Sequence, residues 1–269
     1  MNHDIRVPPE FDQQPCGGQA GPAAGRWRAV LSLGSACAVA YHLHRLGLAD
    51  RTGPVDWFGT HDPDHVAHLL RSDFDGFMDR RTLLILGEHN GYWKVGDAAN
   101  SIFTLHDFPQ VGRKPKPLWK PPFRERVRRA LDRVVEPAWR WLPWLRFPSV
   151  DGKRIPLPGY PEFRRRMDRR VERFLATARD PGPVLFIRRA RQGRGEARLI
   201  HDAVQELRRG RPTGLLVIGL GEEYADDWGL PGIRNAAMPP EDPTRSESWR
   251  GSDEAWDRLF RGCRRDVSP

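Results

Sequence analysis

The sequence predicts an α/β protein with a mixed or mostly parallel sheet flanked by helices, because short apolar runs alternate with stretches of helical periodicity. Residues 184–187 and 215–218 are two such runs, and they enclose a helical pattern over 196–209. This order is typical of two parallel strands joined by a helix. Another apolar run, 29–33, precedes a second helical stretch. With 269 residues, 39% of them hydrophobic, the chain is long enough to bury a sizeable core.

The domain organisation follows from composition. Residues 1–26 are rich in proline, glycine and glutamine and lack apolar periodicity, so we expect a disordered N-terminal tail. Residues 27–269 are expected to form a single α/β domain, interrupted by an irregular insertion at 111–158.

The first elements of the domain have recognisable boundaries. The run 29–33 predicts a buried strand, and Ser35 is the expected N-cap of a helix over 35–46. Gly47 is suited to end this helix, because glycine readily adopts the left-handed conformation found after helix ends. A second short strand is expected at 54–58.

The middle of the chain combines one helix with a β-rich segment. Asp62 and Pro63 form an N-cap and first-turn proline pair ahead of an amphipathic helix. The segment 83–108 is expected to contain strands, with turns at 90–91 and 96–97. Helical periodicity also predicts two later helices, at 160–175 and 253–260.

The insertion at 111–158 carries the basic character of the protein. The formal net charge is +9, yet residues 111–175 alone hold 19 Lys and Arg against 7 Asp and Glu. Eleven of the 25 prolines fall within 109–161, and one amphipathic helix is expected at 123–135. Arginines interleaved with tryptophans suit an anionic surface of lipid, glycan or nucleic acid, or form a solvated surface over a tryptophan-containing core.

The number and spacing of the cysteines and the hydropathy of the chain indicate the cellular compartment of the protein. Cys16, Cys37 and Cys263 are odd in number and far apart, which excludes a disulfide framework and a cysteine-based zinc site. The apolar stretch 29–43 is shorter than the ~20 residues that a membrane-spanning helix needs. We therefore expect a cytoplasmic protein with no transmembrane segment.

No cofactor is expected. Gly219 and Gly221 follow a strand, as in a dinucleotide-binding loop, but the third glycine is missing. Glu222 and Glu223 would repel a pyrophosphate at that position. This sequence therefore predicts an ordinary turn.

No metal site is expected either. Three histidines lie close together in the sequence with two aspartates: His61, His65, His68, Asp62 and Asp64. Two zinc-binding histidines on one helix are normally four residues apart, with a further ligand elsewhere. The first of these histidines precedes the predicted helix, and the other two flank its apolar face.

Cys37 is the first candidate for chemistry. It lies in the first turn of the predicted helix, directly after a buried strand, where unpaired backbone N–H groups and the helix dipole favour a thiolate. The apolar side chains of this helix fall on other sides of the helical wheel: Ala36, Val39, Ala40, Leu43 and Leu46. The alternative interpretation is a small buried residue packed under a loop.

A nucleophilic cysteine needs a base within hydrogen-bond reach. His44 lies seven residues further along the helix, ~10 Å down its axis, and is too distant. His106 is the better candidate, because Phe103 and Leu105 should face one side of a strand while Thr104 and His106 face the other. The alternative is a structural histidine.

These residues resemble a bacterial family of papain-like cysteine peptidases. The resemblance rests on residues 32–40 (SLGSACAVA), 54–57 (PVDW) and 103–108 (FTLHDF). Arginine-rich and apolar stretches at 163–173 and 184–188 follow in the same order. The chain departs from the family pattern at Ala36, where asparagine is frequent, and at Val55, where phenylalanine is frequent. The resemblance implies a papain-like α+β fold as the alternative architecture.

The resemblance implies roles for individual residues. Cys37 would be the nucleophile, His106 the general base and later acid, and the substrate a peptide or amide that passes through an acyl-enzyme. The backbone N–H of Cys37 would be one oxyanion-hole donor. Asp107, next to the histidine, is a candidate for the orienting residue, although neighbouring strand residues point to opposite faces. The competing candidates for that role are Asp56, which lies in the matched Asp-Trp pair, Asn90 and Asn100.

A second function of a different class is consistent with the composition. A non-catalytic or glycosyltransferase-like protein would use the insertion at 111–158 to bind an anionic polymer, a membrane surface or a sugar nucleotide. In that case Cys37 would take no part in the function.

Overall fold

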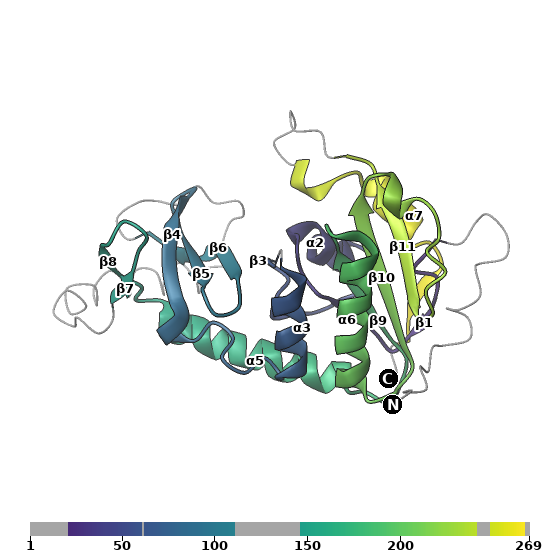
Figure 1. Cartoon of the computed structure of the whole chain (residues 1–269), viewed down its shortest axis with the longest axis horizontal. Coiled ribbons are helices and arrows are strands. Elements are labelled where there is room, and N and C mark those ends of the chain that lie inside the picture. The colour runs from purple at the N-terminus through teal and green to yellow at the C-terminus, as the bar shows by residue number, and fades with distance from the viewer. Residues whose placement is uncertain (1–20, 61, 111–145, 241–247, 267–269) are drawn as a thin grey trace. The chain divides into compact units, whose positions relative to one another are not determined.

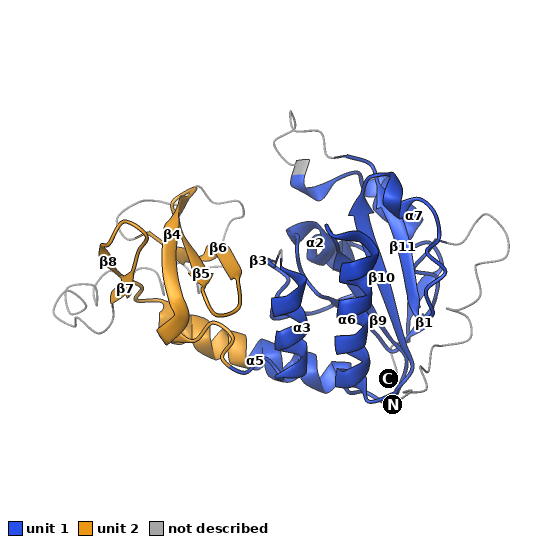
Figure 2. Cartoon of the chain, viewed as in Figure 1, with its two compact units in different colours: residues 1–75, 169–269 blue, residues 76–168 orange. Residues whose placement is uncertain are grey.

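The computed structural model shows a mixed α/β protein. It describes residues 21–60, 62–110, 146–240 and 248–266. The chain divides into two compact units, the first made of residues 1–75 and 169–269 and the second of residues 76–168 (Figures 1 and 2). The insertion predicted at 111–158 lies inside the second unit, and the single-domain organisation stays a prediction. The predicted tail residues 1–20 and the predicted helix at 123–135 lie outside the described residues.

A parallel sheet forms the centre of the first unit. Its strands are arranged in the order β11 (Ile233–Met238), β10 (Thr213–Leu220), β9 (Val184–Arg189) and β2 (Ala29–Ser32). All neighbours are parallel, and Val184 of β9 is in register with both Ala29 and Thr213. Most of the central strands' side chains are apolar and fully buried, as expected for strands covered on both faces.

Helices cover the two faces of this sheet. They are α2 (Cys37–Arg45), α3 (Pro63–Arg71), α6 (Gly193–Arg208), α7 (Asp253–Leu259) and the C-terminal part of α5 (Tyr160–Ala178). On one face, Leu43 of α2 and Trp256 of α7 pack in one cluster with Leu185 and Ile187 of β9. On the other face, Phe174 of α5 contacts Phe186, with ring centroids 6.4 Å apart. None of the described helices is long and apolar enough to cross a membrane.

Short elements complete the first unit. They are the parallel pair β1 (Gly25–Trp27) and β12 (Cys263–Arg265), the strand β3 (Phe58–Gly59), and the 3-10 helices η3 (Glu222–Tyr224) and η4 (Ser248–Arg250). Gly221 is the N-cap of η3, and Gly219 packs directly against the Tyr224 ring. The described backbone there is a turn.

The second unit is built on antiparallel strands. They are β4 (Leu83–His89), β5 (Tyr92–Asp97) and β6 (Ile102–Pro109), followed by the small pair β7 (Arg146–Pro148) and β8 (Arg154–Pro156). A 3-10 helix, η1 (Arg80–Thr82), leads into β4. The first part of α5 packs on this unit, with the rings of Phe108 and Phe163 4.7 Å apart. The sheets of the protein are therefore parallel in one unit and antiparallel in the other.

Several boundaries differ from the sequence prediction. The strand expected at 54–58 is wrong, because only Phe58 and Gly59 are extended and the residues before them form a turn. The turn expected at 96–97 is also wrong: these residues end β5, and the chain reverses over 98–101. Asp97 explains the shift, because its buried carboxylate accepts hydrogen bonds from Met78 N–H and from the Asn100 side chain and holds the turn closed.

The buried side chain of Arg208 at the end of α6 joins three segments of the first unit. Its guanidinium donates to the carbonyls of Ala178, Asp180, Gly182 and Pro212 and to the Thr213 hydroxyl, over 2.5–3.1 Å. Burial, with a smaller contribution from the charge of Arg211, lowers its pKa to about 10. The guanidinium satisfies carbonyls at the C-terminus of α5, which have no partner within the helix.

Candidate active site

The candidate nucleophile, Cys37, is the first residue of α2 and is separated from β2 by the loop 33–36. Ser35 is not the N-cap: Ala36 occupies that position, and no side chain caps the helix. Ser35 has a left-handed backbone (φ 76°), and its N–H donates to the Thr60 hydroxyl 2.6 Å away. No side chain therefore caps the N–H groups at the start of α2, although Val39 N–H donates to the Ala36 carbonyl.

A buried ion pair between β9 and α6 supports the loop before Cys37. Arg188, near the end of β9, donates from Nε to Oε1 of Glu196 in the first turn of α6, at 2.8 Å. Both side chains are only 1% exposed. Oε2 of Glu196 accepts from the N–H groups of Arg191 and Gln192, so both carboxylate oxygens are satisfied. Sequence reasoning missed this pair, because an arginine in an apolar strand and a glutamate in a helix carry no local signal of their contact.

The guanidinium of Arg188 also holds the loop before the cysteine. It donates to the carbonyl of Leu33 at 2.9 Å, and to the hydroxyl and carbonyl of Thr60 at 2.8 and 2.6 Å. The same Thr60 hydroxyl accepts from Ser35 N–H. One buried cation therefore fixes both the start of the loop and the residue that anchors it.

Gly34 occupies a position in this loop where no side chain would fit. Its φ is +74°, a conformation that favours glycine. A Cβ there would lie 2.8 Å from the Val55 carbonyl oxygen and 2.9 Å from the Thr60 hydroxyl. The loop therefore approaches the neighbouring backbone more closely than any other residue type would allow.

The environment of Cys37 opposes ionisation. Burial raises the pKa of its thiol, a hydrogen bond from its own backbone N–H lowers it, and the negative charge of Asp56 raises it further. The helix start is expected to favour a thiolate, but burial of Cys37 has the larger effect and raises the pKa of the thiol. Desolvation outweighs the helix terminus, and the thiol is protonated at neutral pH.

Asp56 is almost fully buried beside the same loop. Its Oδ2 accepts from Gly53 N–H at 2.6 Å, whereas Oδ1 has no hydrogen-bond partner among the described residues. Burial raises the pKa of this carboxyl, and the Gly53 N–H, the Ser32 hydroxyl and nearby cationic groups offset part of the rise. An ionisable group buried with incomplete hydrogen bonding is typical of functional sites.

His106 lies on a β-bulge in the second unit. Val95 of β5 pairs with Thr104, and Trp93 pairs with Phe108, so Lys94 alone opposes residues 105–107. The side chains of residues 102–105 alternate as expected, but the expected buried side is wrong: Thr104 is fully buried, whereas Phe103 and Leu105 are only partly buried. The bulge then redirects His106, whose ring lies half-buried near the rings of His89 and Tyr92, each 6.2 Å away. Bulges commonly redirect side chains next to active sites.

The ring of His106 is neutral at pH 7. Burial lowers its pKa, the charge of Asp107 raises it, and the neighbouring His89 lowers it. Its ring nitrogens have no hydrogen-bond partner in the described part of the chain. A neutral imidazole with a free nitrogen is the form that accepts a proton from a thiol.

Asp107 is held by other groups. Its Oδ2 accepts from the Thr104 hydroxyl at 2.5 Å, and its Oδ1 forms an ion pair with Arg166 at 2.5 Å. It acts on His106 through its charge and not through a direct hydrogen bond. The other candidates for the orienting role have structural contacts: Asn90 donates to His89, and Asn100 donates to Asp97.

The structure thus brings the predicted site residues together in two pairs. Cys37 and Asp56 interact within the first unit, and His106 and Asp107 interact within the second. No cluster of three potential metal ligands occurs among the described residues, which exclude His61. Within the described part of the histidine–aspartate run, the side chains of His65 and Asp62 contact each other at 2.8 Å. Asp62 also caps α3 by accepting from Asp64 N–H, as its position predicts.

The thiol of Cys37 thus lies at the start of a helix that follows a buried strand. Residues 28–218, more than two thirds of the chain, match the family described as "Putative papain-like cysteine peptidase (DUF1796)". The chain belongs to this family. The matched region contains both candidate pairs and the Arg188–Glu196 ion pair.

Among curated proteins, Uncharacterized protein R408 of Acanthamoeba polyphaga mimivirus is 38% identical over 47 residues. This stretch covers 18% of the chain and 21% of the viral protein, so the chain spans about a fifth of this relative's length. No solved structure matches the chain.

The buried ion pair yields the first prediction. We expect Glu196→Gln to lower the free energy of unfolding by about 3 kcal/mol, because it leaves the Arg188 guanidinium buried without a counter-charge. Urea unfolding followed by circular dichroism measures the loss. Glu206→Gln on the same helix is the matched control, since its carboxylate is half-exposed and its pairing with Arg71 contributes less than about 1 kcal/mol. Equal losses of unfolding free energy in the two variants would show that the buried pair stabilises the fold no more than the exposed one.

The environment of Cys37 yields the second prediction. Its alkylation by iodoacetamide should rise with pH around a midpoint above that of an ordinary cysteine, because its pKa is raised. Asp56→Asn should increase the rate at fixed pH by about threefold, since it removes a nearby negative charge. Mass spectrometry after short pulses separates Cys37 from Cys263, whose pKa of about 12 keeps it unreactive.

Asp50→Asn is the control for this measurement, because the exposed carboxylate of Asp50 pairs with Arg265 at 3.2 Å. It should leave the alkylation rate of Cys37 unchanged. A midpoint at or below that of a free cysteine would contradict the assigned environment.

Proposed function

We propose that this protein is a cysteine hydrolase of the peptidase type, with Cys37 as the nucleophile and His106 as the general base. The observation that carries the proposal is the position of Cys37. It begins a helix after a buried strand, on a loop held by a buried Arg–Glu pair, inside the region that matches a cysteine peptidase family. A nucleophile on a fixed loop, at a helix start that no side chain caps, suits acyl transfer.

The protonation states favour a general-base mechanism. Both pKa shifts stabilise the neutral forms, a thiol at Cys37 and an imidazole at His106. The imidazole takes the Sγ proton as sulfur attacks the substrate carbonyl carbon, and negative charge develops on the carbonyl oxygen. The Cys37 N–H at the start of α2 would donate to that oxyanion.

The second half of the reaction reverses the proton transfer. The imidazolium donates its proton to the leaving amine as the C–N bond breaks, which leaves a thioester on Cys37. Water, deprotonated by the same imidazole, then hydrolyses the thioester and restores the thiol. Asp107 supports the imidazolium through its charge, whereas Asp56 disfavours the thiolate and suits a positioning role near the loop.

p-Nitrophenyl acetate provides the test, because it acylates reactive thiols and releases a coloured product. We expect a burst of p-nitrophenolate close to one equivalent and a single acetyl group on the peptide that contains Cys37. Cys37→Ser should abolish the burst. His106→Asn should slow acylation by about 10²-fold or more, the usual contribution of a general base. The rate should fall on the acid side below the ordinary pKa of histidine, because burial lowers the pKa of His106.

His89→Asn is the matched control, because His89 lies beside His106 in the same sheet but is exposed. It should change the acylation rate by about twofold at most, since it alters only a neighbouring charge. Acetyl groups spread over other residues, or equal rates in the two histidine variants, would overturn the assignment of the Cys37–His106 pair.

A further inference from the structure

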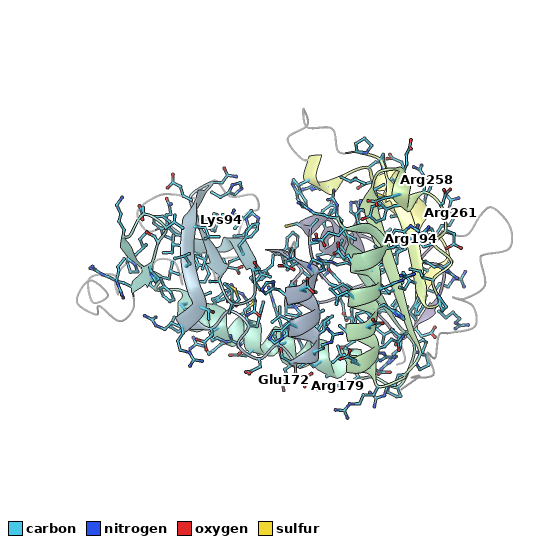
Figure 3. The ribbon with its side chains drawn as sticks, viewed as in Figure 1. Lys94, Glu172, Arg179, Arg194, Arg258 and Arg261 are labelled. Atoms are coloured by element: carbon cyan, nitrogen blue, oxygen red, sulfur yellow. The ribbon has the colours of Figure 1, made fainter. Side chains whose placement is uncertain are left out.

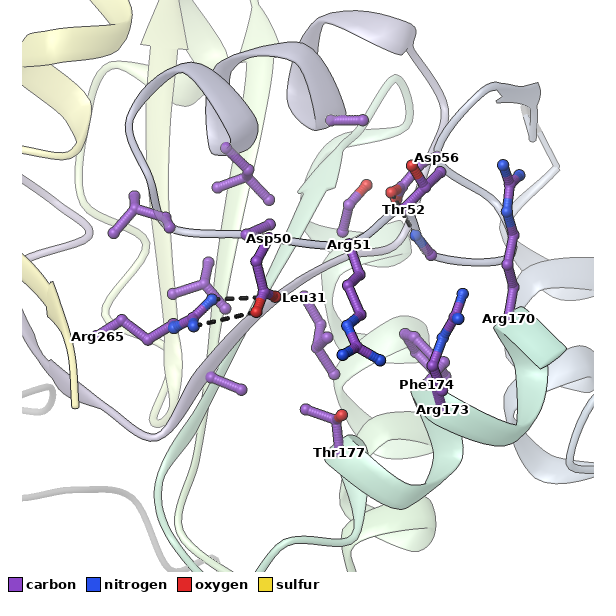
Figure 4. Close-up of a pocket in the computed structure, with 18 of the residues that line it drawn as sticks. Leu31, Asp50, Arg51, Thr52, Asp56, Arg170, Arg173, Phe174, Thr177 and Arg265 are labelled. Carbon is purple, nitrogen blue, oxygen red and sulfur yellow. Dashed lines mark hydrogen bonds and ion pairs between the residues drawn. The ribbon is translucent and has the colours of Figure 1, made fainter. Parts of the chain in front are cut away.

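The first unit contains a cavity of about 540 Å³ that the proposed hydrolysis does not use (Figure 4). It lies between β2, the second half of α5, and the loop 48–56. Its apolar lining includes Leu31, Leu43 and Phe174. The volume is within the range of small-molecule sites. The rest of the lining is strongly charged, because it contains five arginines and four aspartates.

The charges around this cavity do not cancel. Arg265 pairs with Asp50 at 3.2 Å, and Arg28 pairs with Asp180 at 3.1 Å, so these two arginines are neutralised. Asp266 of the lining pairs with Arg26 at 3.3 Å, and the buried carboxyl of Asp56 accepts from Gly53 N–H at 2.6 Å.

Two arginines of the lining are not neutralised in this way. Arg51 and Arg173 form no ion pair or hydrogen bond within the described part of the chain, although both line the cavity and are exposed. Figure 4 shows Arg51 extending from the loop toward α5, and Arg170 and Arg173 extending from α5 toward the loop. Guanidinium groups reaching from opposite walls form an arrangement suited to a shared oxyanion.

We propose that this cavity binds a small organic molecule that carries a phosphate or carboxylate group. The oxyanion would lie between the guanidinium groups of Arg51 and Arg173, with the hydroxyls of Thr52 and Thr177 at the same walls. The organic part would contact the apolar lining around Phe174. Phosphate binds more tightly than carboxylate here, because it carries more negative charge at neutral pH.

This site is independent of the proposed hydrolysis. Its anion-binding residues are on the loop after α2 and on α5, and Cys37 does not line the cavity. Asp56 is the one candidate site residue that both share. Binding should therefore persist in a variant without the thiol.

Isothermal titration calorimetry of the full chain tests the proposal with three probes that share a phenyl ring: phenyl phosphate, benzoate and neutral benzyl alcohol. We expect one equivalent of phenyl phosphate to bind, benzoate to bind more weakly, and benzyl alcohol to give no measurable heat. Arg51→Gln and Arg173→Gln should each weaken phenyl phosphate binding by about tenfold, the value of one charge-assisted hydrogen bond. Arg51→Lys and Arg173→Lys should lie in between, because they keep the charge and lose the two-pronged geometry.

Arg169→Gln is the matched control, since it removes the same charge from an exposed position of α5 outside the cavity. It should weaken binding by about twofold at most through the general field. Cys37→Ser should bind like the wild type whether or not the protein is a hydrolase. Absence of phenyl phosphate binding, equal binding of benzyl alcohol, or equal losses in Arg169→Gln and Arg173→Gln would overturn the site.

Discussion

The buried ion pair between Arg188 and Glu196 is the interaction on which the candidate site depends. Desolvating two charges is costly, and such pairs persist where hydrogen bonds satisfy both partners. Here the carboxylate accepts two further backbone N–H groups, and the guanidinium reaches the Leu33 carbonyl and Thr60. A single contact thus links the end of β9, the start of α6 and the loop before Cys37. The geometry at the start of α2 is consequently set by the core and not by a local cap.

This arrangement gives the site a particular chemical character. The same burial that fixes Cys37 also raises the pKa of its thiol, and burial on the other unit lowers the pKa of His106. Two neutral partners need a proton transfer during attack, so the proposed reaction uses His106 as a true general base and not as the counter-ion of a preformed thiolate. A protonated thiol is a weaker nucleophile than a thiolate. In the proposed reaction the fixed loop offsets this loss, because it holds Cys37 in one position for attack.

Sequence periodicity predicted those parts of the fold that depend on local patterns. The strands around residues 184 and 215, the helix between them and the Asp62 cap of α3 were all confirmed. Sequence periodicity failed where tertiary contacts determine the local conformation. Ser35 has the chemistry of an N-cap, but its backbone is left-handed and α2 begins after Ala36 instead. The bulge at 105–107 interrupts the alternation of β6 before His106. The Arg188–Glu196 pair joins residues on separate elements and could not be found from spacing. The functional pairing of Cys37 with His106 stays a prediction.

Hydrogen exchange at the Ser35 amide tests most directly whether the buried network holds the loop before Cys37. This N–H donates to a Thr60 hydroxyl that is itself bound by Arg188, all within the core. We expect the amide to exchange only through global unfolding, with the same free energy of opening as the Leu216 amide in the central strand β10. Exchange through a much smaller opening free energy, typical of a fraying loop, would contradict it.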